Sequence, residues 1–106
     1  MFTINGEQWD IVLVQPNDMA LLMPNGDFAV GACSDVIKTI FLSDELYGED
    51  FERVLCHELV HAAMFAYNIS LSWEDEEMLA EIISIFGEEI IDLTDIIFER
   101  IAKGRH

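Results

Sequence analysis

The sequence predicts a small α+β domain in which a short, mainly antiparallel sheet packs on two helices. Two observations predict this class: β-branched and aromatic runs separated by turn residues occupy residues 2–42, and long helical patterns occupy most of the remainder. Apolar residues make up 52% of the chain, which excludes disorder. With 106 residues there is material for one modest core, so residues 1–106 are expected to form a single domain.

The first elements expected are two strands and a hairpin turn. Residues 2–4 and 8–14 are strand candidates, and Asn5-Gly6 between them is a dipeptide that favours a tight hairpin. Pro16 then ends the second strand. Residues 19–23 form a short apolar run that is expected to be a turn of helix or a loop packed on the core.

A second pair of strands is expected before the first long helix. Pro24-Asn25-Gly26-Asp27 predicts a turn, and residues 28–33 and 36–42 should pair as antiparallel neighbours. We expect Lys38–Leu42 to be an edge strand beside the functional site, where its free N–H and C=O groups would face an extended substrate.

Two helical patterns complete the chain. The first should run from about Glu49 to Tyr67 and end with Asn68 in a left-handed conformation. The second starts after Ser72, which is a good N-cap residue, and Gly87 is expected to kink or break it. The tail after residue 102 should fray, and His106 is expected to be a solvated terminal residue.

The first long helix contains the motif His57-Glu58-Leu59-Val60-His61. Residues four apart lie on one helix face, so the imidazoles of His57 and His61 can converge on one ion, and zinc suits such ligands. Glu58 points about 100° away from His57, where it can act as general base toward a water activated by the zinc. This combination predicts zinc-dependent hydrolysis of peptide bonds.

A third protein ligand is expected from the acidic start of the next helix. The candidates are Glu74, Asp75, Glu76, Glu77 and Glu81. At 100° per residue, Glu76 falls nearest the middle of the apolar arc formed by residues 79, 80, 83 and 86, whereas Glu77 falls at its edge in line with Ala80 and Glu81. Helical geometry alone leaves the choice among them open.

Residues 57–61, followed after about fifteen residues by Glu76-Glu77-Met78-Leu79-Ala80, resemble the gluzincin metallopeptidases. The chain looks most like the short zincin-like peptidases of phage and prophage genomes, which are related to the ImmA/IrrE type; the likeness covers roughly residues 36–87. It implies a minimal zincin fold, zinc as the cofactor, His57 and His61 as ligands and Glu58 as general base. Glu77, which stands in a Glu-x-x-Ala setting, would be the third ligand, with Glu76 as the alternative.

Other residues have weaker claims to a role. Tyr47 and Tyr67 are candidates for stabilising an oxyanion, although both are more simply helix-end packing residues. Asp50 is a candidate partner for the outer nitrogen of a ligand histidine, or a helix cap. Cys56 is rotated away from the histidine face, so it is not counted as a ligand.

The charge balance indicates what the chain would bind. It has 21 acidic and 5 basic residues and a formal net charge of −16, which argues against nucleic acids and anionic membranes and favours a basic or regulatory peptide or protein substrate. No secretion signal and no apolar run near 18 residues are present, and the two cysteines fit a reducing compartment, so a cytoplasmic location is expected.

Two alternatives to a peptidase remain open from the sequence. One is a binding or regulatory module in which zinc only stabilises the fold. The other is a subunit of a larger, phage-related assembly, for which Ile-rich residues 90–101 would supply a helical interface. The substrate and the oligomeric state do not follow from the sequence.

Overall fold

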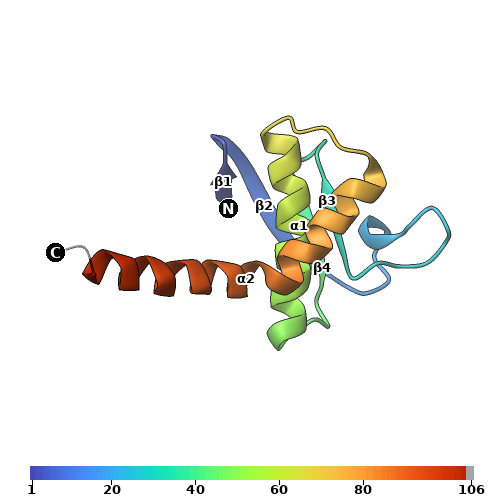
Figure 1. The fold of residues 1–106 in the computed structure, drawn as a ribbon. Helices are drawn as coiled ribbons and strands as arrows, with labels where there is room; N and C mark the ends of the chain where they lie inside the picture. The colour runs from blue at the N-terminus through green and yellow to red at the C-terminus, as the bar shows by residue number, and fades with distance from the viewer. Residues whose placement is uncertain (105–106) are drawn as a thin grey trace.

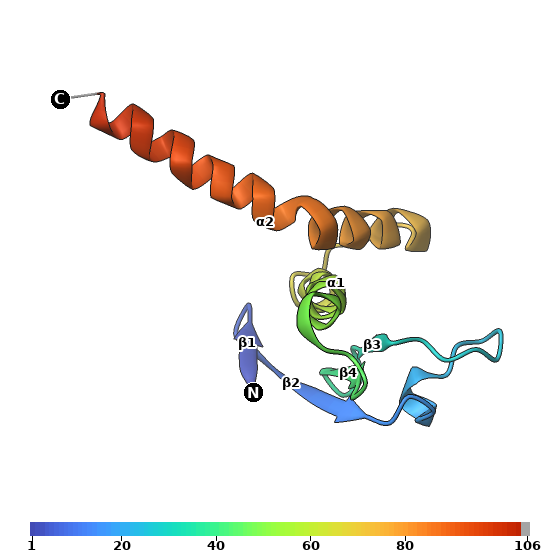
Figure 2. The same cartoon turned by 90° about the horizontal axis from the view of Figure 1, so that it is seen from below.

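The computed structural model describes residues 1–104, and the expectation for His106 lies outside the described residues. The chain forms a four-stranded sheet and two helices in the order β1, β2, η1, β3, β4, α1, α2, which confirms the α+β class. Figure 2 shows three layers, with the sheet on one side of α1 and α2 on the other.

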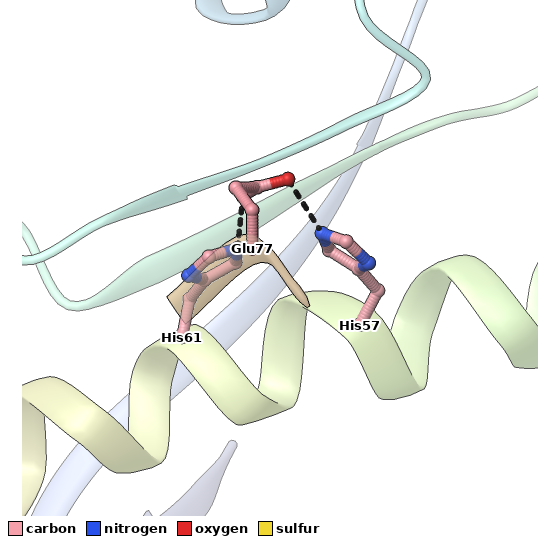
Figure 3. A group of neighbouring side chains, drawn as sticks. All are labelled: His57, His61 and Glu77. Atoms are coloured by element: carbon pink, nitrogen blue, oxygen red, sulfur yellow. Dashed lines mark ion pairs between the residues drawn. The ribbon is translucent and has the colours of Figure 1, made fainter. Parts of the chain in front are cut away.

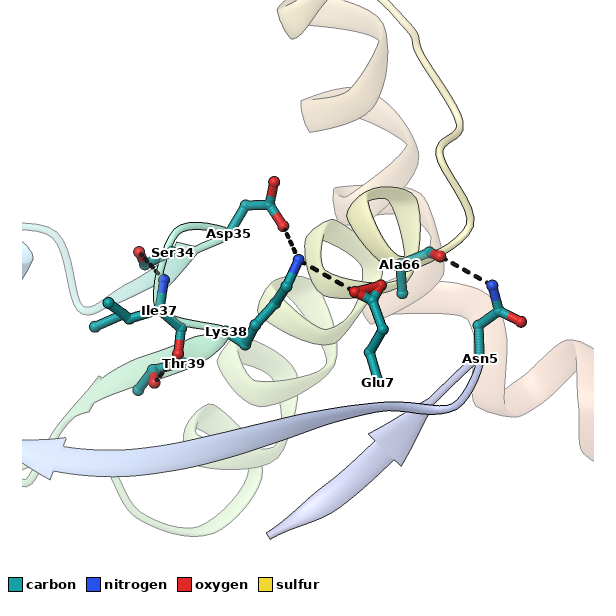
Figure 4. Close-up of polar contacts among 8 residues, drawn as sticks. All are labelled: Asn5, Glu7, Ser34, Asp35, Ile37, Lys38, Thr39 and Ala66. Atoms are coloured by element: carbon teal, nitrogen blue, oxygen red, sulfur yellow. Dashed lines mark hydrogen bonds and ion pairs between the residues drawn. The ribbon is translucent and has the colours of Figure 1, made fainter.

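The N-terminal hairpin forms as expected. Strand β1 spans Phe2–Ile4, β2 spans Glu7–Val14, and they pair antiparallel with Phe2 opposite Trp9. Asn5 and Gly6 have φ values of 50° and 77°, as a tight turn matching the strand twist requires. The Asn5 side-chain amide donates to the carbonyl of Ala66 at 3.0 Å and so ties the hairpin to the end of α1 (Figure 4).

The remaining two strands pair as antiparallel neighbours, as expected, but their bounds differ from the expected ones. Strand β3 spans Gly31–Ser34 and β4 spans Thr39–Ser43, and the two pair antiparallel. The sheet order is β1-β2-β4-β3, and β2 and β4 run parallel. The sheet is therefore mixed rather than simply antiparallel, although two of its three strand pairings are antiparallel.

The expectation that Lys38–Leu42 forms an edge strand is wrong. Strand β4 lies between β2 and β3, and both of its backbone edges are paired, so β3 is the edge strand on this side of the sheet. Residues 36–38 belong to the turn: Val36 is exposed, and Lys38 has a φ of 52°. The Lys38 ammonium pairs with Asp35 at 2.6 Å and with Glu7 at 3.1 Å (Figure 4), which fixes this turn beside β2.

The core lies between the sheet and α1. Its fully buried cluster consists of Trp9 from β2, Ile40 and Leu42 from β4, and Ala62 from α1. Ala62 lets α1 approach the sheet closely, and it lies one residue after His61. The packing that buries Ala62 therefore also fixes the orientation of the motif.

Helix α1 spans Gly48–Ala66, close to the expected range, and Asn68 follows it with a φ of 54°, as predicted. The run Met19–Leu21 forms the short 3-10 helix η1. Among residues 1–104, no helix combines the length and the apolar composition needed to cross a membrane.

Helix α2 spans Trp73–Lys103, and the Ser72 hydroxyl accepts from the backbone N–H of Asp75 at 3.2 Å, which confirms the N-cap. Gly87 does not break the helix. The axis of α2 nevertheless bends in the orange part of the ribbon, around residues 80–90. Beyond the bend the helix projects from the body (Figures 1 and 2). This projection makes the molecule elongated, with extents of 58 × 30 × 28 Å.

Candidate metal centre

Helices α1 and α2 bring two imidazoles and one carboxylate together. His57 and His61 lie one turn apart on α1, and Glu77 reaches between them from the first turns of α2 (Figure 3). One ligand atom from each residue lies within 4.8 Å of the others, a group that could hold a metal ion. The two Glu77 oxygens lie 3.4 Å from Nε2 of His57 and 2.6 Å from Nε2 of His61.

The close approach of the two helices depends on Ala80. It is fully buried where α2 crosses α1, because its methyl side chain leaves room for the backbones to come together. Glu77 lies three residues before it, almost one turn back and slightly to one side. Glu76 lies to the other side, which explains how two consecutive glutamates both reach the histidines.

Glu76 and Glu81 contact the outer nitrogens of the same imidazoles. Glu76 Oε2 lies 2.6 Å from Nδ1 of His61, and Glu81 Oε1 lies 3.4 Å from Nδ1 of His57. A carboxylate can only accept, so a proton on Nδ1 would satisfy Glu76 and Glu81 and would leave Nε2, the nitrogen nearest Glu77, to bind a metal ion. This is the tautomer that a metal-binding histidine needs.

Glu58 lies beside this group and is almost fully buried, with 8% of its surface exposed. Burial raises the pKa of its carboxyl above the usual value, nearby Glu77 raises it further, and His61 and His57 oppose the shift. Its side chain packs against the backbone of β3: a Cβ added at Gly31 would lie 3.1 Å from Glu58 Cγ and 3.2 Å from Oε2.

The group opens into a cleft of about 680 Å³. Its walls are the segment around η1, the edge strand β3, one face of α1 and the start of α2. Apolar side chains such as Leu22, Val30 and Phe65 line it together with the histidines and glutamates. The cleft is thus an apolar site with a few convergent polar groups, as binding sites for small molecules and peptides usually are.

Cys33, on β3, also lines the cleft. Burial raises the pKa of its thiol to about 12, and the charges of Glu58 and Asp35 add to the shift. The thiol therefore stays protonated at neutral pH and is a poor metal ligand or nucleophile. Cys56 is free as well.

Several sequence-based expectations do not coincide with this site. Tyr47 and Tyr67 lie at the two ends of α1, and neither lines the cleft. Asp50, a candidate either for an outer nitrogen or for a helix cap, lies in the first turn of α1, 4.0 Å from Arg53, and the carboxylates beside the outer nitrogens are those of Glu76 and Glu81.

Sequence reasoning missed the roles of Gly31 and of Glu81. A signal for Glu81 was present, because Glu77 and Glu81 are four residues apart, as are His57 and His61. Two such pairs on crossing helices can face each other. Gly31 had no comparable signal, because a glycine in a strand has several explanations.

Comparison of the chain with protein-family models, with curated proteins and with solved structures gave no match. The resemblance to gluzincins therefore rests on the motif and its spacing, and function has to be argued from the site itself.

Proposed function

We propose that the chain is a zinc-dependent peptidase of the gluzincin type, with His57, His61 and Glu77 as zinc ligands and Glu58 as general base. The observation that carries the proposal is the buried Glu58 carboxylate next to the three-residue group, at the wall of an open cleft. A group that only binds metal has no need of a further buried carboxylate beside it.

The donor set suits zinc. Two imidazoles and one carboxylate are the ligands of a common kind of catalytic zinc site, which leaves a fourth position for water or substrate. The carboxylates of Glu76 and Glu81, which contact the outer nitrogens of the two histidines, further support metal binding. Such contacts orient the imidazole rings and raise their basicity. Zinc in such a site supplies Lewis acidity that makes water nucleophilic near neutral pH.

Glu58 would move the proton. Its carboxylate takes a proton from the attacking water and returns it to the nitrogen of the departing amine. Burial raises the pKa of this carboxyl in the metal-free chain, whereas a bound cation would lower it, so the role rests on the position of Glu58 beside the group. Packing against the backbone at Gly31 would hold the carboxylate in place through both transfers.

The edge strand β3 would bind the substrate. Its outer edge is unpaired within the sheet, and residues 29–33 line the cleft beside Glu58. An extended peptide can add to such an edge through main-chain hydrogen bonds. The net charge of −16 favours a basic peptide or a basic regulatory protein, and the likeness to the ImmA/IrrE type suggests a repressor. The two free cysteines agree with a reducing compartment such as the cytoplasm, where the substrate would then also be found.

The test is hydrolysis of a mixed peptide library by the zinc-loaded chain, with products identified by mass spectrometry. We expect Glu58→Gln to lower kcat/KM by at least about a hundredfold while zinc content is retained, because only proton transfer is lost. Glu52→Gln, on an exposed part of the same helix, is the matched control and should remain active. Equal activity of wild type and Glu58→Gln would contradict the proposal.

A second candidate is a binding module stabilised by zinc. The small core favours it: within residues 1–104 the fully buried cluster has four side chains, and the contacts between α1 and α2 include the polar pairs of Glu76 and Glu77 with the two histidines. Metal binding in such a domain contributes directly to folding. This candidate predicts chelator-sensitive stability without cleavage of any library peptide, and Glu58→Gln would then be silent.

A further inference from the structure

The projecting part of α2 exposes large apolar side chains that no other part of residues 1–104 covers. The residues concerned are Ile90, Ile91, Leu93, Ile96, Ile97, Phe98 and Ile101, each at least 47% exposed. An isolated helix of about 12–15 residues is only marginally stable in water, because most helical stability in proteins comes from packing of an apolar face. The projecting segment therefore requires a partner surface.

The spacing of part of this surface indicates another helix as the partner. Leu79, Ile83, Phe86, Ile90, Leu93 and Ile97 follow one another at alternating intervals of four and three residues; we call these six residues the coil stripe. This is the repeat of helices that supercoil around each other. Isoleucine occupies one of the two repeated positions, and leucine or phenylalanine the other, a composition that suits two-stranded packing.

Four of the five acidic residues of the projecting segment lie away from the coil stripe. At 100° per residue, Glu88, Asp92, Asp95 and Glu99 are centred about 170° from it, and Glu89 lies at its flank, about 80° from its centre. Two copies joined along the stripe would therefore direct their acidic rows outward, where repulsion is weakest. The same acidic rows disfavour an anionic membrane surface, for which a helix needs a basic polar face.

The body of the molecule leaves the coil stripe accessible beyond the bend: Phe86, Ile90, Leu93 and Ile97 are each at least 49% exposed, whereas Leu79 is partly buried next to Ala80. The stripe is centred about 100° from Ala80, the residue that α2 buries against α1. In a pair related by a two-fold axis, a partner helix can lie alongside α2 without displacing α1 or the sheet. Each copy then offers and covers the same surface, as an isologous contact requires.

We propose that a second copy of this chain covers the coil stripe, so that the protein is a dimer held by paired α2 helices. The dimer is independent of hydrolysis, because Glu58 and the cleft lie on other faces of the helices. Salt strengthens the dimer, because it screens repulsion between two strongly acidic chains while the apolar contact is unaffected.

Sedimentation velocity of the full chain from about 1 to 200 µM, at low and high salt, tests the proposal. The wild type should sediment as a dimer over most of this range. Ile90→Glu places a charge on each side of the contact and should raise the dimer dissociation constant by at least about a hundredfold. Ile97→Glu, also on the stripe, should act alike.

Ile91→Glu is the matched control. It makes the same change at the next residue, which is 63% exposed but lies about 120° from the centre of the stripe. This variant should remain dimeric. Helix content from circular dichroism and zinc content identify any variant that has lost its fold. A monomeric wild type at 200 µM, a trimer or tetramer, or equal effects of Ile90→Glu and Ile91→Glu would overturn the proposal.

Discussion

The chemistry of the site is divided among neighbouring glutamates whose roles depend on small differences in direction. Glu76 and Glu77 are consecutive, yet one contacts Nδ1 of His61 and the other contacts Nε2. Glu81, one turn after Glu77, lies beside His57. Such outer contacts normally set ring orientation and ligand basicity, so they govern affinity without binding the ion.

We therefore expect Glu76→Ala and Glu81→Ala each to weaken zinc binding by about 10- to 100-fold while still allowing the site to load at excess zinc. The effect of Glu76→Ala should be larger, since its contact is shorter and more buried than that of Glu81. Competition with a chromophoric chelator measures both affinities.

Glu74→Ala is the control for this pair. Glu74→Ala removes the same charge from the same helix, in the turn that holds Glu76, but Glu74 does not line the cleft. Its zinc affinity should match that of the wild type. If all three variants bound zinc equally, the outer carboxylates would have no part in the site.

At the scale of elements, the site depends on how closely β3 approaches α1. Glycine at position 31 provides the space, because a Cβ there would lie only 2.8 Å from Cγ1 of Val54 and against Glu58. A substitution at this position must move either the strand or the helix that carries the motif.

Gly31→Ala should lower the free energy of unfolding by about 1–3 kcal/mol, the usual cost of overpacking. Gly87→Ala is the contrasting variant: its new Cβ meets only the partly exposed Ile83 side chain at 3.3 Å, and alanine is the better helix former. Urea titrations of both should show a loss of stability at residue 31 and none at residue 87. Equal stability of the two would contradict the packing described for Glu58.

Local signals predicted the elements better than their arrangement. The Asn5-Gly6 turn, the Ser72 cap and the motif helix followed from residues close together in sequence. Strand order did not follow, because β2 and β4 pair across a long connection and their composition carries no information about neighbours. The choice between Glu76 and Glu77 likewise depends on where two helices cross, which wheel arithmetic on one helix cannot supply.

At the scale of the whole molecule, the three-residue group joins the two helices above a small sheet. Trp9, Ile40, Leu42 and Ala62 bury the contact between sheet and α1, whereas α2 is held to α1 around Ala80 and the polar group. Bound zinc would therefore link the outermost layer to the rest. Ligand binding to the folded state alone adds about 2.7 kcal/mol of stability at a concentration one hundred times Kd.

Zinc stoichiometry by elemental analysis, with the thermal midpoint recorded before and after chelation, tests the central claim most directly. We expect about one zinc per chain, a midpoint that falls when zinc is removed, and loss of zinc in Glu77→Ala but not in Glu74→Ala. A wild-type chain that carries no zinc, cannot be loaded and unfolds at the same temperature with and without chelator would contradict the metal centre and the peptidase proposed from it.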